Sequence, residues 1–588
     1  MKKTILLFII ILGFTLRFYQ LGSNPPSLYW DEVALGYNAF SIAETARDEE
    51  GKFLPIQYFR SFGDFKPPVY IYAAVPMIKL FGLNEWTTRF PSAFFGSLSI
   101  VLTYLLTRQL FRRLAPSEPI FLTSDRVEWI SILAALMLAI SPWHTQISRV
   151  AYEANVSLFL TILGVWLFLK ATESGSRKTL LLSLSGISFV LTFYTFNSSR
   201  VFTPLLVALL AFIYRDKLFK LQIDIRKVLI ASILSIAILI PLLSHLASSE
   251  GQLRYKEVNI FSSPEPVAVS NARTARLGNS WWAGILNNRR ILYAQNWLDG
   301  YFQHFSGKFL FITGDVNPRF SLQDVGGLYI IELPFILIGI YLILSRRKPE
   351  HLLLLGWMLL GPVPAAFARE TPHALRSLNI LPTFQIIECY AFVYILYKLN
   401  LKRINGKLVS KGVVGITAAI LTFSLYYYQH NYFVHYPRWT SQEWQYGYKE
   451  AMEEVKAVQH EYDRIVVTGA LGRPYIEALF YLQYPPGLFQ KERRARTDQT
   501  GFGFIEVDGF NKYEFHEVNW KSEIAKQQSD EKVLLIGTTG ELYNQKYATK
   551  IIKRLNGETV LIMSDVPKGY DALIELGLLD ENGNPIVD

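Results

Sequence analysis

Apolar runs of about 20 residues, long enough to cross the hydrocarbon core of a bilayer, recur along residues 1–430 and then stop. Of the 588 residues, 51% are apolar and only 18% are charged. After residue 431, charged residues become frequent and the apolar runs shorten to the length of strands. The sequence therefore predicts a polytopic α-helical membrane protein over residues 1–430, followed by a soluble α/β domain at 431–588.

The apolar runs also predict the topology. We expect eleven spans, near residues 4–20, 88–108, 127–145, 152–171, 178–195, 200–215, 227–247, 326–345, 350–368, 376–398 and 411–430. With that number, the clusters of Lys and Arg all fall on one side, which is the cytoplasm because cytoplasmic loops are enriched in these residues. We therefore expect a multi-pass protein of the cell membrane with a cytoplasmic N-terminus. The net charge of +10 is mainly this signal and does not call for a nucleic acid.

The opposite, extracytoplasmic side then receives a loop at 21–87, a long loop at 249–325 and the tail. In the first loop, the apolar stretch at 67–82 is too short to cross, so it is predicted to be a juxtamembrane helix. In the tail we expect a helix at 441–460 and strands at 464–468, 502–507, 533–537 and 559–563. The segment 537–540 lacks the glycine spacing of a dinucleotide-binding turn.

Two adjacent carboxylates, Asp31 and Glu32, follow the first predicted span in the sequence Tyr29-Trp30-Asp31-Glu32. A charged pair against the bilayer surface, flanked by aromatic residues, is a hypothesis for a functional site. The alternative is a solvated helix cap just outside the membrane.

Several cations are expected on the same outer face, where short loops normally carry few of them. They are Lys66, Arg149, Arg200, Arg369, His373 and Arg376. Converging cations at the level of the lipid headgroups suit a phosphate on a lipid carrier, because arginine binds phosphate as a planar fork and lysine as a point charge. Taken singly, each cation is better explained as an anchor to anionic lipid, and it is the combination of four such loops that favours the phosphate.

Further candidate substrate contacts lie in the same outer loops, although most aromatic residues there are expected to form the interfacial belt. These candidates are Tyr29, Trp30, Trp143, His144, Tyr152, Glu153, Tyr194 and Asn197. No cluster of cysteine or histidine has the spacing of a metal site, so we expect no resident metal, although a divalent ion is not excluded.

The order of these motifs resembles the GT-C superfamily of polyprenyl-phosphate-sugar glycosyltransferases. Trp30-Asp31-Glu32, Lys66-Pro67-Pro68, Thr88–Ser92, Ser141–Asn155, Tyr194–Arg200 and Pro372–Asn379 carry the resemblance, which covers roughly residues 5–400. Within the superfamily, the sequence is most similar to family 39, the bacterial relatives of protein O-mannosyltransferases and of the aminoarabinose transferase acting on lipid A.

This resemblance implies an inverting transfer of a monosaccharide from a lipid monophosphate carrier on the outer face, with the carrier as a co-substrate. By matching motif, Asp31 would be the catalytic carboxylate, Glu32 the second acidic position and Lys66 a ligand of the donor phosphate. The other cations follow from the charge argument above. The acceptor, a protein, lipid or cell-envelope glycan, stays open.

Three alternative functions compete with this prediction. A transporter or flippase of a lipid-linked sugar or anion would favour charges at the membrane midplane and paired broken helices. A membrane anchor that displays the tail leaves the outer charges unexplained. Oligosaccharide transfer to asparagine is disfavoured because Trp281-Trp282 is followed by Ala283, whereas oligosaccharyltransferases of the superfamily have Trp-Trp-Asp.

Overall fold

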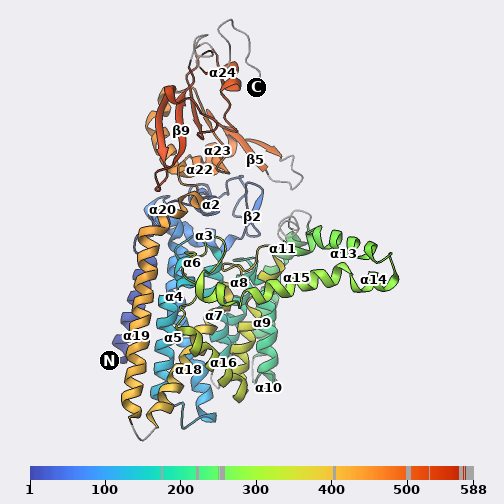
Figure 1. The fold of residues 1–588 in the computed structure, drawn as a ribbon, viewed down its shortest axis with the longest axis vertical. Coiled ribbons are helices and arrows are strands. Elements are labelled where there is room, and N and C mark those ends of the chain that lie inside the picture. The colour runs from blue at the N-terminus through green and yellow to red at the C-terminus, as the bar shows by residue number, and fades with distance from the viewer. Residues whose placement is uncertain are drawn as a thin grey trace. The chain divides into compact units, whose positions relative to one another are not determined.

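The computed structural model shows a helical membrane portion and a mixed α/β portion (Figure 1). It describes residues 1–567 together with 574, 576 and 577, except for 174–175, 220–223, 249–250, 252–258, 402–404, 498–504 and 529. The chain divides into two compact units. Unit 1 comprises residues 1–21, 67–70 and 89–432, and unit 2 comprises 22–66, 71–88 and 433–588. The loop that carries Asp31 thus clusters with the C-terminal domain.

Unit 1 is a bundle of helices, most of them long. They are α1 (Lys2–Phe18), α4 (Glu85–Leu114), α5 (Ser124–Ile140), α6 (Pro142–Ser148), α7 (Glu153–Ala171), α8 (Lys178–Phe193), α9 (Ser199–Ile213), α10 (Arg215–Phe219), α11 (Ile225–Ala247), α16 (Glu332–Arg346), α17 (Pro349–Leu360), α18 (Thr383–Asn400) and α19 (Gly406–His430). Each of the eleven predicted spans overlaps one of these helices, and the predicted span 127–145 overlaps both α5 and α6. Five helices, or six with a bent pair counted as one span, are long and apolar enough to cross a membrane within the described residues.

That bent pair is α5 and α6, which meet at an angle of 56°. The break has a local cause. Ser141 caps α6, accepting a hydrogen bond from the His144 backbone at 3.4 Å, and Pro142 occupies the first turn. Proline suits a helix start because its missing N–H would be unsatisfied there anyway. The bend carries the predicted contact residues Trp143 and His144 into a short, buried helix.

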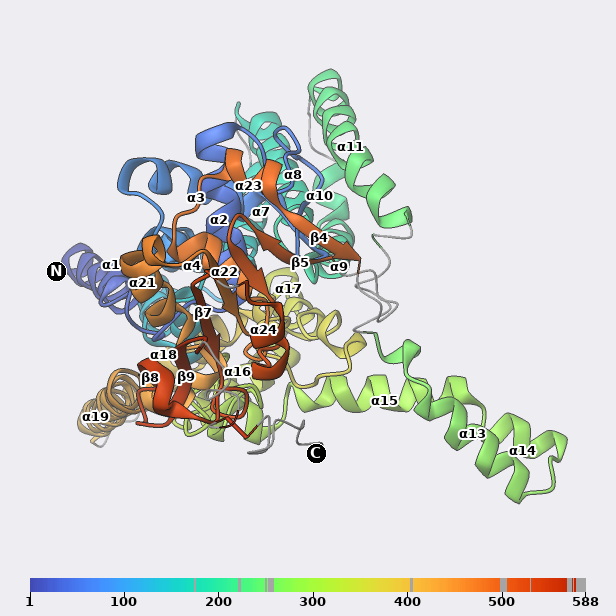
Figure 2. The ribbon, with the colours of Figure 1, turned by 90° about the horizontal axis from the view of Figure 1, so that it is seen from above.

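A helical arm leaves the bundle of unit 1 between α11 and α16. It consists of α13 (Glu265–Arg276), α14 (Trp281–Leu286) and α15 (Arg289–Gln303). Figures 1 and 2 both show it extending sideways, across the direction of the bundle helices.

Unit 2 begins with α2 (Trp30–Thr45) and a hairpin of β1 (Phe59–Ser61) and β2 (Asp64–Lys66), and α3 (Pro68–Phe81) is the predicted short helix. The C-terminal portion contains α20 (Tyr436–Thr440), α21 (Tyr448–Val458), α22 (Pro474–Tyr481), α23 (Pro486–Glu492) and α24 (Trp520–Lys526). The predicted helix 441–460 is interrupted because Gln445 and Gly447 have positive φ angles, 51° and 125°, and only 448–458 is α-helical.

The C-terminal strands form one mixed sheet in the order β4-β5-β6-β3-β7-β9-β8. Their bounds are β3 (Arg464–Val467), β4 (Arg494–Thr497), β5 (Ile505–Phe510), β6 (Tyr513–Phe515), β7 (Val533–Gly537), β8 (Ala548–Lys553) and β9 (Thr559–Asp565). The central strands β3 and β7 are parallel and almost wholly buried, as expected of continuous apolar runs. The predicted strand 502–507 is partly matched by β5, and its first residues lie outside the described part.

The glycine-containing turn after β7 does not open a helix. Glu541 accepts a hydrogen bond from the Thr538 backbone at 2.7 Å, and the chain continues to β8 through a short 3₁₀ turn, Gln545–Tyr547. A phosphate-binding turn needs free N–H groups at a helix N-terminus. This arrangement therefore gives no support to a nucleotide site.

Candidate active site

The predicted catalytic carboxylate lies in the first turn of α2. Tyr29 is the extended N-cap residue, and Glu32 accepts a hydrogen bond from the Tyr29 backbone N–H at 3.1 Å. Asp31 is beside this cap, where the helix dipole favours a negative charge. Its side chain remains 38% exposed, so the carboxylate is accessible to a substrate.

The predicted phosphate ligand Lys66 is delivered by the β1–β2 hairpin. Phe59 pairs with Lys66 and Ser61 with Asp64. The turn residues Phe62 and Gly63 have φ angles of 43° and 81°, which suits the two-residue turns that match strand twist. Because side chains alternate along a strand, Asp64 and Lys66 point to the same face.

The hairpin brings the lysine to the carboxylate. Lys66 forms an ion pair with Asp31 and a second one with Asp64, at 2.7 Å between Nζ and Oδ2. The Lys66 side chain is only 7% exposed and lies 5.0 Å from the ring centre of Phe62. Two carboxylates around one ammonium leave a net negative charge. The structure therefore brings Asp31 and Lys66 together. It adds Asp64 to the cluster, which sequence reasoning missed.

Glu32 is placed differently from its neighbour. It is fully buried and serves as the helix cap, whereas Asp31 reaches the surface. Glu477 on α22, also buried, is close enough for the charge of Glu32 to affect it, and burial followed by this charge raises the pKa of Glu477 well above its usual value. Glu32 is thus suited to orienting α2, as a positioning residue.

A second buried carboxyl, Glu49, links α2 to the hairpin and to α22. It accepts hydrogen bonds from Asn38 at 2.7 Å, from Ser61 at 2.6 Å and from Tyr475 at 3.0 Å. Tyr475 also accepts one from the Phe62 backbone at 2.8 Å. Burial raises the pKa of Glu49 to about 8. This network holds the two elements that carry Asp31 and Lys66 in register, and sequence reasoning missed it because Asp48-Glu49-Glu50 has the appearance of a solvated acidic run.

The C-terminal domain contacts the same elements elsewhere. Gln445 accepts a hydrogen bond from the Trp30 backbone at 2.7 Å, and Tyr37 donates one to the Tyr484 carbonyl at 3.0 Å. Gly472 packs against Trp30 so closely that an added Cβ would lie 2.5 Å from the indole ring. The first turn of α2 is therefore braced by the C-terminal domain.

In unit 1, the predicted phosphate-binding cations occupy separate environments. Arg149 is fully buried, donates to the carbonyls of Leu16 at 3.0 Å, Arg17 at 3.2 Å and Gln20 at 3.3 Å, and donates to the Tyr432 hydroxyl at 3.2 Å. These carbonyls end α1, whose last turn leaves acceptors without helical partners. Arg149 is therefore enclosed as a cap of α1.

The remaining arginines are more accessible. Arg200 is half-buried and donates to the Phe193 carbonyl at 3.1 Å. Arg369 is exposed and donates to the Asn259 carbonyl at 3.3 Å, and Arg376, half-buried, lies 4.0 Å from Glu370. Arg369 and Arg376 share one loop with His373.

That loop is fixed by an aspartate and a histidine. Asp315 accepts a hydrogen bond from the Ala374 backbone at 2.5 Å, and His304 accepts one from the His373 backbone at 3.0 Å. Burial raises the pKa of Asp315 to about 6 and lowers the pKa of His373 well below its usual value. The lowered pKa favours the neutral form of His373, whose backbone bond to His304 places it as a residue that holds the loop.

The predicted substrate contacts also separate by burial. Trp143 donates to the Ala374 carbonyl at 2.9 Å, His144 contacts Arg17 at 2.7 Å and Tyr194 donates to the Ile238 carbonyl, and all three are buried. Tyr152 packs on Phe320 in the core. Tyr29, Trp30 and Glu153 are half-buried and Asn197 is exposed, so these four have surface to offer a ligand.

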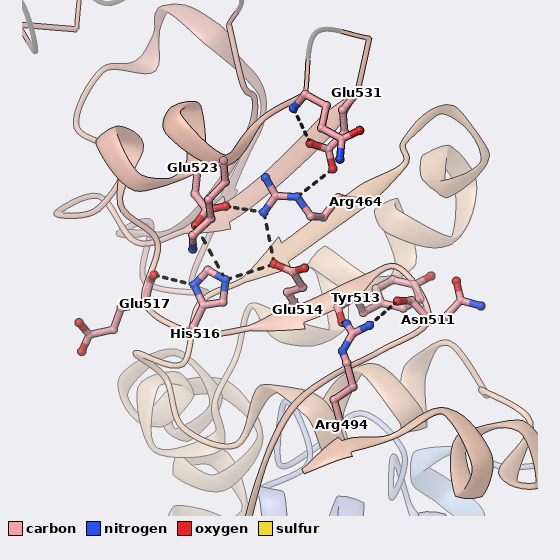
Figure 3. Close-up of polar contacts among 11 residues, drawn as sticks. Arg464, Arg494, Asn511, Tyr513, Glu514, His516, Glu517, Glu523 and Glu531 are labelled. Atoms are coloured by element: carbon pink, nitrogen blue, oxygen red, sulfur yellow. Dashed lines mark hydrogen bonds and ion pairs between the residues drawn. The ribbon is translucent and has the colours of Figure 1, made fainter. Parts of the chain in front are cut away.

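Glu514, His516 and Glu523 form a group that could hold a metal ion, with ligand atoms within 4.8 Å of one another. Figure 3 shows that Arg464 already joins this group, with Nη1 at 3.2 Å from Glu514 and 2.6 Å from Glu523. Lys526 contacts Glu523 at 3.2 Å. Because these cations already neutralise the carboxylates, the group resembles an ion-pair network, and we assign it no metal.

Residues 7–250 match the model of the dolichyl-phosphate-mannose-protein mannosyltransferase family. A solved structure of ArnT from Cupriavidus metallidurans bound to undecaprenyl phosphate is similar, with a TM-score of 0.52 and 11% identity, covering 95% of this chain and 97% of ArnT. The archaeal oligosaccharyltransferase AglB from Archaeoglobus fulgidus, in complex with an inhibitory peptide and a dolichol-phosphate, aligns with a TM-score of 0.48 and 14% identity over 82% of this chain. This chain covers only 63% of the length of AglB. A search of curated protein sequences finds no match.

The family match confirms the resemblance inferred from the motifs, and the similarity to ArnT confirms the GT-C fold. The family model ends at residue 250, before the arm and the C-terminal domain. Over residues 7–250 the chain is therefore similar to the dolichyl-phosphate-mannose-protein mannosyltransferase family, and its fold is that of ArnT.

Proposed function

We propose that the protein transfers a monosaccharide from a polyprenyl-phosphate carrier to a protein, lipid or cell-envelope glycan on the extracytoplasmic face, through an inverting single displacement. In this proposal the protein crosses the membrane eleven times, and its N-terminus is cytoplasmic. The observation that carries it is the Asp31–Lys66–Asp64 cluster, an accessible carboxylate at a helix N-terminus beside a buried ammonium. The undecaprenyl phosphate bound to ArnT supports a polyprenyl carrier.

Asp31 acts as the general base. It removes the proton from the acceptor hydroxyl or amine while that atom attacks the anomeric carbon. The bond from the anomeric carbon to the phosphate oxygen breaks, and the polyprenyl phosphate leaves with the electron pair. The ion pair with Lys66 fixes the direction of the Asp31 carboxylate, which suits a base that must meet the acceptor in one geometry.

The leaving phosphate needs compensation for its negative charge more than it needs a proton. Lys66 supplies positive charge next to the base, and Arg200, Arg369 and Arg376 are the accessible cations of unit 1 that we assign to the phosphate. Arg149 is assigned to capping α1 and His373 to holding the loop. Glu32 and Glu49 position Asp31.

The test is a transfer assay with purified protein in detergent, a panel of radiolabelled polyprenyl-phosphate sugars and a membrane extract as acceptor. We expect one sugar to be transferred, and Asp31→Asn to lower the rate by about 10²–10⁴-fold. Glu44→Gln is the matched control, because Glu44 is an exposed carboxylate near the other end of α2. Binding of the donor without transfer would overturn the proposal in favour of a lipid-sugar transporter, and normal transfer by Asp31→Asn would overturn the role of Asp31.

A further inference from the structure

The arm of unit 1 has a tip whose composition does not suit water. Trp281, Trp282, Ile285 and Leu286 on α14 are 79%, 44%, 57% and 67% exposed. Soluble surfaces rarely expose such a contiguous apolar group, and an exposed patch of this kind marks a protein or membrane contact. Tryptophan in particular favours the headgroup level of a bilayer.

The charge on the arm favours an anionic membrane surface as the partner of the tip. The arm of residues 265–303 contains four arginines, Arg273, Arg276, Arg289 and Arg290, and two acidic residues, Glu265 and Asp299, which lie near its root. All four arginines are exposed. A helical segment that combines exposed apolar residues with an excess of arginine over acidic residues is complementary to an anionic lipid surface.

Contacts at the root of the arm place it relative to the end of a candidate membrane span. Tyr301 donates to the Leu359 carbonyl at 2.8 Å, and the rings of Trp297 and Phe367 lie 5.7 Å apart. Leu359 and Phe367 belong to the candidate membrane span Pro349–Phe367, near its Phe367 end. The arm therefore leaves the bundle at the level where this span leaves the membrane.

The arm runs at a steep angle to the helices of the bundle. Figures 1 and 2 show α13 and α15 running across the bundle helices, so that the arm lies roughly parallel to the plane of a membrane crossed by the bundle. An element at this depth and in this direction meets lipid headgroups along its length.

We propose that the arm of residues 265–303 docks onto the bilayer surface, with the apolar residues of α14 in the boundary between headgroups and acyl chains and its arginines on anionic headgroups. The root of the arm also contacts the loop of Arg369 and Arg376, because Gln303 accepts a hydrogen bond from Thr371 at 3.3 Å. Docking would hold this loop at headgroup depth. The functional importance of holding this loop rests on its proposed role in binding phosphate. The docking of the arm does not depend on that role.

The test places a spin label at the tip of the full-length protein. Ile285→Cys in a Cys389→Ser background is labelled with a nitroxide and reconstituted in nanodiscs of phosphatidylcholine with phosphatidylglycerol. Ile233→Cys, an exposed position on the apolar helix α11, is the lipid reference, and Asn556→Cys, exposed in the turn before β9, is the water reference. We expect the label at 285 to be accessible to oxygen, as at 233, and shielded from a water-soluble nickel chelate.

The alternatives give different spectra. Accessibility to the nickel chelate equal to that at 556 would place the tip in water and overturn docking. A label shielded from both reagents and broadened by a second label would show an interface between copies of this chain and would also overturn it. Since no sugar transfer is measured, the outcome is independent of the proposed function.

A second measurement tests the arginines. In the parent protein, replacing phosphatidylglycerol by phosphatidylcholine should make the label at 285 several-fold more accessible to the nickel chelate. Changing Arg273, Arg276, Arg289 and Arg290 to Gln should abolish this difference. If the lipid exchange has no effect in the parent protein, the assignment of anionic headgroups is wrong.

Discussion

The charged residues predicted to face outward have different surroundings in unit 1 and in unit 2. In unit 2, Asp31, Asp64 and Lys66 meet one another, and Asp31 remains accessible. In unit 1, Arg149 donates its hydrogen bonds to the carbonyls that end α1, and burial lowers the pKa of His373. A cation predicted to lie in an outer loop can hold the fold or hold a ligand, and its partners separate the two roles: Arg149 is bonded to backbone carbonyls, whereas Lys66 pairs with the carboxylates of the candidate site.

Among the variants that test this comparison, the largest loss of activity is expected for a substitution of Lys66. Lys66→Gln removes the charge beside Asp31 and should lower kcat/KM for the lipid-phosphate donor by about 10²–10³-fold, the usual loss for one preorganised electrostatic contact. Lys52→Gln, at an exposed lysine of the same loop, is the control and should leave transfer unchanged. Steady-state transfer kinetics with both variants decide the matter, and full activity of Lys66→Gln would remove Lys66 from the site.

Arg149 should show the opposite pattern. Arg149→Met leaves the carbonyls of Leu16, Arg17 and Gln20 without their donor, so we expect a loss of about 3 kcal/mol in stability. The folded fraction should keep its KM for the donor. Thermal unfolding in detergent and donor titration measure the two effects.

Arg376→Gln is the contrasting variant, with little change in stability and a KM for the donor raised about tenfold, equivalent to about 1.4 kcal/mol. A raised KM in Arg149→Met, or an unchanged KM in Arg376→Gln, would reverse the assignment of the two arginines.

Glu49 tests how rigidly unit 2 holds its site. Glu49→Gln places an amide N–H₂ against donors from Asn38, Ser61 and Tyr475, so we expect a loss of about 1–3 kcal/mol in stability and a lower kcat at unchanged KM. Tyr475→Phe removes one of the three donors and should give a smaller loss in the same direction. An unchanged kcat in both variants would limit Glu49 to a structural role.

The same residue predicts a pH dependence. The pKa of Glu49 is raised by burial to about 8 from an ordinary value near 4.5. Its protonated form therefore favours the folded state. This contribution is fully present below pH 4.5 and is lost as pH rises to about 8, because the unfolded chain ionises first. Thermal unfolding across this range should show the decline in the wild type and a weaker decline in Glu49→Gln.

The smallest effect is expected in the cluster of Figure 3. The hydrogen bond to Glu514 raises the pKa of His516, and its partner Glu514 has a pKa lowered to about 2. The His516 contribution is present below pH 6.5 and is lost as pH rises through the folded pKa; that of Glu514 is present above pH 4.5 and is lost as pH falls toward 2. His516→Gln should therefore reduce stability at pH 5.5 and leave it unchanged at pH 9. Equal destabilisation at both pH values would show that His516 acts by packing.

The sequence predicts much of this fold for physical reasons. Apolar length alone locates the helices of the bundle, and buried β-branched runs locate β3, β7 and β9. The edge strand β8 was missed because it is mostly exposed and has no apolar run. The break at Gln445 was missed because its positive φ has no glycine or proline at that position to signal it.

The candidate site was predictable in part. Asp31 and Lys66 follow from motif order, and Phe62-Gly63 was a usable signal for the hairpin that joins them. The capping role of Arg149 depends on carbonyls more than 120 residues away in sequence, and no local pattern encodes such a contact. The burial of Glu49 likewise depends on α22, which lies in the distant C-terminal domain.

The most direct measurement of the central claim is the anomeric configuration of the transferred sugar, determined by NMR on the product of a donor with known configuration. A single displacement with Asp31 as base predicts inversion at the anomeric carbon. Retention would require two displacements through a glycosyl-enzyme intermediate, and it would contradict the assignment of Asp31 as a general base.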